Sequence, residues 1–184
     1  MTKILGICGS AAPKSSTKKL IETALDAAKA AGAEVEFIDA AKMDIHGCRG
    51  CLACKKDQTK FCVQKDDMTP LYEKINAADA VIIGSPIYFG ENTGQIKCFV
   101  DRMYAFLGPE GSKMKAGKKA VAVITQGMAD VKVYENCAGI LTAGFRYCGA
   151  AIEAPLIVGE LHSAEDLKAE ALAAAEQLGK KLAN

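Results

Sequence analysis

Four cysteines stand together in one short segment, at Cys48, Cys51, Cys54 and Cys62. Their spacing is C-x2-C-x2-C-x7-C, and we interpret residues 46–64 as a cysteine insertion. Three thiols at such short intervals, with a fourth after a polar loop, could together ligate a small inorganic centre. The compact spacing favours a [4Fe–4S] cluster, because a C-x2-C-x2-C run also binds clusters in bacterial ferredoxins.

Two other uses of these thiols stay open. Structural zinc usually takes C-x2-C pairs that are separated by a longer segment than this one. The thiols could also be free, on an ordinary surface loop. The spacing favours the iron–sulfur cluster over free thiols, and free thiols over zinc.

The length and composition indicate one compact domain over residues 1–184, because half of the residues are hydrophobic and can form a sizeable core. The formal net charge of +1 gives no basic footprint, so we expect no nucleic-acid partner. No apolar run is as long as a membrane span, and the N-terminal run is too short for a secretory signal. Eight cysteines without an export signal then indicate a cytoplasmic protein that does not associate with a membrane.

Short apolar runs alternate with helical periodicity along the whole chain. Strands this apolar are typical of a parallel sheet whose two faces are both covered by helices, which predicts the α/β class. Pro86 is expected to end the third strand. The predicted strands cover residues 3–8, 35–38, 80–85, 120–125 and 151–158.

Capping residues help to place the helices between these strands. Apolar residues recur at helical spacing from Thr17 until Gly32, where a left-handed residue would end the helix. Thr69 is expected to cap the second helix, followed by Pro70 at its first position. Ser163 and Asp166 are expected to open the terminal helix through a capping box. The other helices are predicted at residues 96–103 and 132–147.

The loop GSAAPKSST, residues 9–17, follows the first strand, and ligands bind such sheets beyond the carboxyl ends of strands. Pro13 precedes Lys14 where a Walker A loop needs glycine, and a dinucleotide fingerprint would need further glycines. A hydroxyl-rich loop of this kind suits a terminal phosphate at the start of the following helix. For this loop alone, an ordinary capped turn has equal weight. The candidate phosphate ligands are Ser10, Ser15, Ser16 and Thr17.

The loops after the third and fourth strands should reach the same edge of the sheet. Apolar and aromatic groups beside a phosphate site would suit a planar ring with a ribityl tail. The alternative is that Tyr88 and Phe89 pack on a neighbouring helix or on a second subunit. The candidate ring contacts are Pro86, Ile87, Tyr88 and Phe89, with Thr125, Gln126 and Gly127 closing the pocket from the other side.

Three motifs together resemble the flavodoxin-like NADPH-dependent FMN reductase family, in particular its iron–sulfur flavoprotein branch. The motifs are GSAAPKSST, the cysteine run that ends in DDM, and SPIYFGENTGQIKCFVDR. The resemblance implies a flavodoxin-like three-layer sandwich with a five-stranded parallel sheet in the order 2-1-3-4-5. It also implies FMN held by the three loops, a homodimer or homotetramer, and a [4Fe–4S] cluster that passes electrons to FMN.

Carried over residue by residue, the family's roles fall on the candidates already given. The resemblance assigns the phosphate to the hydroxyls of the first loop, the flavin ring to residues 86–89 and the cluster to the four cysteines. The first loop departs in part from the family's usual GSPRKxSNT. It has Ala11 for the proline, Ala12 for the arginine and Ser16 for the asparagine.

The implied activity is that of an FMN-dependent oxidoreductase. Electrons would come from NAD(P)H or a ferredoxin-type iron–sulfur donor and pass to a quinone, a flavin or an oxygen species. The flavin carries such chemistry, so no catalytic acid or base is expected. The rival hypothesis is a non-enzymatic flavodoxin-type carrier or a flavin-binding sensor, and the near-neutral charge argues against an acidic carrier.

Several other polar residues receive only general interpretations. Asp101 and Arg102 are expected to form a subunit contact or a solvated pair on a helix. His162 has no partner that the sequence identifies. Four lysines of one charged loop are expected to face water or to meet the phosphates of a pyridine nucleotide. They are Lys113, Lys115, Lys118 and Lys119.

Overall fold

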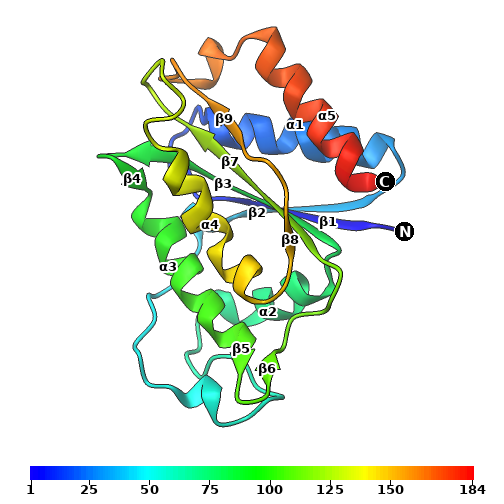
Figure 1. The fold of residues 1–184 in the computed structure, drawn as a ribbon. Coiled ribbons are helices and arrows are strands. Elements are labelled where there is room, and N and C mark those ends of the chain that lie inside the picture. The colour runs from blue at the N-terminus through cyan, green and yellow to red at the C-terminus, as the bar shows by residue number, and fades with distance from the viewer.

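The computed structural model describes all residues from 1 to 184 and shows a twisted parallel sheet between two layers of helices (Figure 1). The strand order is β2-β1-β3-β7, with two short strands on the outer edge of β7. This confirms the predicted flavodoxin-like order, 2-1-3-4-5. The strands are β1 (Lys3–Cys8), β2 (Glu34–Asp39), β3 (Ala80–Tyr88), β7 (Lys119–Thr125), β8 (Ala151–Ile152) and β9 (Leu156–Val158).

Two strand predictions were wrong in detail. The fifth strand is split into β8 and β9, and Pro155, which has no N–H to donate, stands in the break. The third strand does not end at Pro86 but continues to Tyr88. Its pairing with β1 stops at Gly84 and its pairing with β4 begins at Ile87, so Pro86 has a paired strand on its β7 side alone. Proline is tolerated on a strand with one free side.

The helices divide between the two faces of the sheet (Figure 1). One buried cluster joins the sheet to α1 (Ser16–Ala30) and α5 (Ala169–Ala183). A larger cluster joins the opposite face to the other three helices, which are α2 (Met68–Ala77), α3 (Gly94–Arg102) and α4 (Glu135–Tyr147). Shorter elements are the strands β4 (Glu91–Asn92), β5 (Leu107–Gly108) and β6 (Gly111–Ser112) and the 3-10 helices η1 (Ala40–Lys42), η2 (Ala53–Lys55), η3 (Met103–Phe106) and η4 (Ala164–Asp166). No helix is long and apolar enough to cross a membrane.

The first helix follows from its sequence. Ser15 caps α1, because its Oγ accepts a hydrogen bond from the N–H of Lys18 at 3.0 Å. The helix packs closely against α5: a Cβ on Gly179 would lie only 1.9 Å from the carbonyl oxygen of Ala24. Gly32 has a φ of 95° after the end of α1, as the left-handed end predicts.

Three helix starts differ from the predictions. Thr69 does not cap α2. The helix starts at Met68, two residues before the predicted start at Pro70, and Asp66 accepts the N–H of Met68 at 3.2 Å. The helix predicted from residue 132 starts at Glu135. Ser163 and Asp166 do form a capping box, but on η4 rather than on α5, which starts at Ala169 because the chain is extended in between.

Lys118, which precedes β7, is buried rather than solvated or poised for a nucleotide. Its Nζ donates hydrogen bonds to the carbonyl oxygens of Asn76 and Ala78 at the end of α2. Burial lowers the pKa of Lys118 to about 8. The lysine thus stabilises a helix end, but at the cost of placing an ammonium group in the protein interior.

We expect the free energy of unfolding to contain a term that rises with pH between about 8 and 10.5, the folded and ordinary pKa values of Lys118. In that range the unfolded chain binds more protons than the folded one, so deprotonation favours folding. Lys118→Met should lose this term. Urea unfolding of both proteins across this range checks it, and parallel curves of free energy against pH would contradict it.

Candidate functional site

A polar pocket lies at the carboxyl end of the sheet, between the loops after β1, β3, β7 and β9. It contains ten of the eleven residues predicted for the cofactor, which shows that the three predicted loops do converge. The predicted members are Ser10, Ser15, Ser16, Thr17, Pro86, Ile87, Tyr88, Thr125, Gln126 and Gly127. The members that sequence reasoning missed are Ala12, Lys14, Leu161 and His162.

Phe89 is the predicted cofactor residue that the pocket does not contain. Its side chain is fully exposed, and its φ of 50° is unusual for a residue other than glycine. It occupies the turn between β3 and β4, where Gly90 also has a positive φ. The turn therefore directs Phe89 away from the pocket, and Tyr88 alone of the two aromatic residues lines it.

In the loop after β1, residues 9–17, which we call the phosphate loop, the four hydroxyl residues are buried, whereas residues 11–14 are exposed. The hydroxyls of Thr17 and Thr125 lie 2.6 Å apart, which joins the first turn of α1 to the end of β7. No aspartate or glutamate lines the pocket, whereas Lys14 does. The positive end of the helix dipole points to the same place. These features favour an anion at the start of α1.

A second set of hydrogen bonds fixes the neighbouring loop. The hydroxyl of Thr93, the cap of α3, donates to the carbonyl oxygen of Gly9 at 2.7 Å. Its N–H donates to the hydroxyl of Ser85 at 3.0 Å. A Cβ on Gly9 would lie 2.4 Å from that of Ile96, so only glycine fits there. The loops after β1 and β3 are therefore held together before any ligand binds.

Gln126 offers an acceptor that no protein group uses. Its side chain is 3% exposed, and its Nε2 donates to the carbonyl oxygens of Met128 and Asp130 at 3.2 and 2.7 Å. These two bonds fix the orientation of the amide, and they leave its buried Oε1 without a partner. A buried polar atom of this kind normally has a partner. A donor on a bound molecule, such as a hydroxyl or a ring N–H of FMN, would satisfy it.

The residues of the pocket therefore fit FMN on three points. Helix N-terminal hydroxyls and the absence of carboxylates suit its phosphate, the orphan acceptor of Gln126 suits a donor, and Ile87 with Tyr88 supplies apolar surface for the ring.

The cysteine insertion forms a long loop that is clasped at its base. Arg102 pairs with both carboxylate oxygens of Asp66 and also donates to the carbonyl oxygen of His46 at 2.9 Å. The side chains of Arg102 and Asp66 are 1% and 0% exposed, so the prediction of a subunit contact or a solvated pair for Arg102 was wrong. Although burial alone raises the pKa of Asp66, hydrogen bonds from Arg102 and from the N–H of His46 hold it below its usual value.

Two lysines fix the far end of this loop. Lys55 donates to the carbonyl oxygens of Tyr104 and Leu107. Lys113 donates to the carbonyl oxygens of Cys54 and Lys60, at 2.8 and 2.5 Å. Its ammonium group is therefore bound to the protein rather than left for water or a nucleotide phosphate. The cysteine loop is thus attached to the β5–β6 hairpin by lysine-to-carbonyl bonds in both directions.

The four thiols of the loop do not converge. Cys48 and Cys51 are exposed, and Cys54 and Cys62 are partly buried. Nowhere in the chain do three His, Cys, Asp or Glu side chains lie where they could hold one metal ion. The donor set suits an iron–sulfur cluster chemically, but this conformation does not assemble it.

One protein-family model and several known proteins match this chain. The model described as NADPH-dependent FMN reductase matches residues 2–135. An iron–sulfur flavoprotein of Archaeoglobus fulgidus is 35% identical over 183 residues, which cover 98% of this chain and 79% of that protein. An iron–sulfur flavoprotein of Methanocaldococcus jannaschii is 39% identical over 100 residues, or 54% of this chain. That match, like one to an iron–sulfur flavoprotein of Methanosarcina thermophila, spans about half of the relative's length.

Solved structures agree on the fold. An NAD(P)H:quinone oxidoreductase from Methanothermobacter marburgensis has a TM-score of 0.74 at 17% identity, with 98% of this chain and 95% of that one covered. An archaeal flavodoxin has a TM-score of 0.61 at 12% identity, with 99% and 96% covered. The match of the family model to most of the chain, together with the near full-length archaeal relative, shows that the chain belongs to the NADPH-dependent FMN reductase family, in its iron–sulfur flavoprotein branch.

Proposed function

We propose that this chain is an FMN-dependent oxidoreductase that takes electrons from NAD(P)H or an iron–sulfur donor and passes them to a small acceptor, such as a quinone, a flavin or an oxygen species. The observation that carries the proposal is the carboxylate-free pocket with the unpartnered acceptor of Gln126. The family assignment supports the flavin and the class of reaction. The names of structural neighbours, which include a quinone oxidoreductase and a flavone reductase, support the class of acceptor.

The protein's own part is to bind and orient the flavin. The hydroxyls at the start of α1 would hold the phosphate, and Gln126 would accept a hydrogen bond from the bound molecule. Pro86, Ile87 and Tyr88 would support the ring. When bound, FMN supplies hydride or single-electron transfer. No side chain in the pocket is assigned a catalytic proton transfer.

Steady-state turnover tests the proposal. Protein reconstituted with FMN should oxidise NADH or NADPH, or a reduced ferredoxin-type donor, when a soluble quinone is added. The apoprotein before FMN addition is the control. FMN binding with turnover no faster than that of free FMN, for every donor and acceptor tried, would instead favour the non-enzymatic carrier or sensor.

We also propose that the four cysteines hold a [4Fe–4S] cluster in the functional protein. The spacing of the thiols and the names of the relatives support this. Since the thiols do not converge here, the loop would have to rearrange around the cluster. Iron and acid-labile sulfide in equal amounts after anaerobic purification would support the cluster. Stoichiometric zinc without iron would favour a structural zinc site instead. Protein that contains neither metal would favour free thiols.

Cys51→Ser is expected to abolish any cluster absorbance and to leave FMN binding unchanged, because the cysteine loop and the flavin pocket share no residue. Cys98→Ser, in α3 and outside the four-cysteine run, is the matched control and should retain both. Absorbance, iron content and FMN content measured on the same samples decide. Loss of FMN in Cys51→Ser would show that the cysteine loop also shapes the flavin pocket.

The remaining expectations are also proposals. The resemblance to the family supports a homodimer or homotetramer, a cytoplasmic location and a ferredoxin-type electron donor, without nucleic-acid or membrane partners. Sedimentation equilibrium of the FMN-loaded protein tests the oligomer, and a sedimenting monomer would contradict it.

A further inference from the structure

The segment after β9, residues 159–166, forms a fourth wall of the flavin pocket. It is tied to the loop after β7, because the N–H of Leu161 donates to the carbonyl oxygen of Gln126 at 3.0 Å. It is tied to the phosphate loop as well, because the N–H of Ala164 donates to the carbonyl oxygen of Lys14 at 3.0 Å. His162 therefore lies between two anchor points, one on the loop after β7 and one on the loop after β1.

The shape of this segment is fixed by its own hydrogen bonds. The carboxylate of Asp166 accepts the N–H groups of His162 and Ser163, both at 2.8 Å. These two bonds hold the pKa of Asp166 below its usual value. Glu165 also pairs with Lys14 at 2.5 Å, a third link to the phosphate loop. The backbone around His162 is thus fixed by the fold before a ligand arrives.

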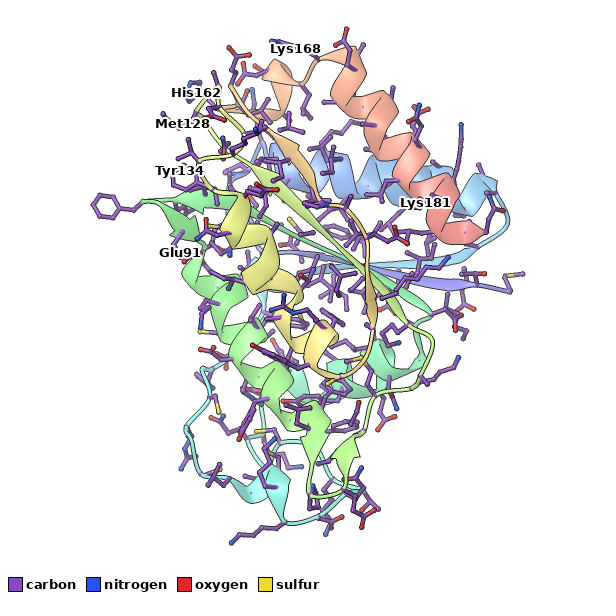
Figure 2. The ribbon with its side chains drawn as sticks, in the orientation of Figure 1. Glu91, Met128, Tyr134, His162, Lys168 and Lys181 are labelled. Atoms are coloured by element: carbon purple, nitrogen blue, oxygen red, sulfur yellow. The ribbon has the colours of Figure 1, made fainter.

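His162 is exposed and lies at the rim of the pocket. Its Cε1 lies 3.4 Å from where a Cβ would stand on Gly127, and the residue lines the pocket with the hydroxyls of α1. Figure 2 shows His162 at the end of the sheet where Met128, of the loop after β7, also lies. The ring thus stands over the carboxyl end of the strands, on the side where the phosphate loop and the β7 loop meet.

The pocket lining has few residues that could bind an anion, and His162 is one of them. Lys14 and His162 are the two lining residues that can carry a positive charge, and no carboxylate lines the pocket. Lys14 is already paired with Glu165. Position 12, where the resembled motif has an arginine, is Ala12 and offers no donor. Besides the exposed Lys14–Glu165 pair, the phosphate end therefore has one further basic side chain that can donate a hydrogen bond to an anion, the imidazole of His162.

We propose that His162 is a specificity-determining residue that donates a hydrogen bond to the phosphate of the bound flavin and so selects FMN over riboflavin. This rests on the proposed FMN site. A charged hydrogen bond to a phosphate oxygen is stronger than a neutral one. Because riboflavin has no phosphate, the contact should change the affinity for FMN alone.

Flavin titrations of the full chain, followed by fluorescence quenching, test this. His162→Ala is expected to weaken FMN binding about tenfold and to leave riboflavin binding unchanged. His162→Lys should restore most of the preference for FMN, because a cation returns to the same wall. His46→Ala removes the chain's other histidine, which does not line the pocket. It is the matched control and should keep the wild-type ratio of the two affinities.

The outcomes separate the two proposals. Wild-type protein that binds FMN, with an unchanged FMN-to-riboflavin ratio in His162→Ala, would overturn the role of His162 and leave the FMN site standing. Equal losses for both flavins would show a packing role and would also overturn it. Should His162→Ala unfold, His162→Gln keeps the size and removes the charge, and the same ratio decides. Wild-type protein that binds no FMN would overturn both proposals.

Discussion

Arg102→Met is expected to lower the free energy of unfolding by about 3–5 kcal/mol, the range for removing one partner of a buried ion pair. The substitution would leave the carboxylate of Asp66 buried without its cation, since both side chains are almost fully inside the protein. It would also remove the hydrogen bond to the carbonyl oxygen of His46. Urea unfolding followed by far-ultraviolet circular dichroism measures the change.

The neighbouring residue provides the control. Asp101→Asn removes an exposed pair with Lys97, which should contribute at most about 0.5 kcal/mol. Because Arg102 clasps both ends of the cysteine loop, the variant should also be cut faster by trypsin after the lysines of that loop. A loss of stability no larger than that of Asp101→Asn would contradict the buried clasp. A double variant, Arg102→Met with Asp66→Leu, should recover part of the loss.

Ser16→Asp is expected to weaken FMN binding by at least about a hundredfold, because like charges brought together in a binding site cost several kcal/mol. Ser16 is 7% exposed, begins α1 and lines the pocket. The carboxylate of an aspartate at this position would therefore meet the phosphate directly. The asparagine of Ser16→Asn has nearly the same shape as that aspartate but no charge. This variant should bind FMN about as well as the wild type. Isothermal titration with FMN measures both.

The two variants must differ for the assignment to stand. Equal affinities in Ser16→Asp and Ser16→Asn would contradict a phosphate at the start of α1. Riboflavin gives a further check, because without a phosphate it should discriminate much less between the two variants. Circular dichroism of each variant confirms that the comparison is made between folded proteins.

The layers of the fold could be predicted because hydrophobic burial decides them. The apolar runs of β1, β3 and β7 are buried on both faces, and parallel strands of this kind place their carboxyl ends at one edge. The edge strand was harder to predict, since β8 and β9 have one neighbour only and Pro155 interrupts them. The start of α5 was missed because Ser163 caps a shorter helix with the same signature.

The candidate site was predictable as far as it follows from topology. Loops after adjacent strands must meet, and ten of the eleven predicted residues do line one pocket. Phe89 does not, because the direction of a side chain in a two-residue turn depends on a backbone angle that sequence patterns do not give. His162 was missed because its neighbours Leu161 and Ala164 are anchored by backbone bonds to Gln126 and Lys14, which lie far away in the chain.

Long-range partners account for the other differences. Arg102 reads as half of an exposed pair with Asp101, whereas its true partner is Asp66, 36 residues earlier. Lys118 reads as a solvated loop residue, whereas it is buried against carbonyl oxygens 40 and 42 positions earlier. The spacing of the cysteines predicts a set of donors, but their convergence depends on how the loop between its clasp and its lysine anchors is arranged.

The most direct test of the account is the flavin content of the protein. The protein should be purified anaerobically, incubated with FMN, freed of unbound flavin by gel filtration, and then denatured so that the released flavin can be identified and counted. We predict about one FMN per chain in the wild type and almost none in Ser16→Asp. Wild-type protein that retains no FMN, or Ser16→Asp that retains as much as the wild type, would contradict the assignment of this pocket to FMN.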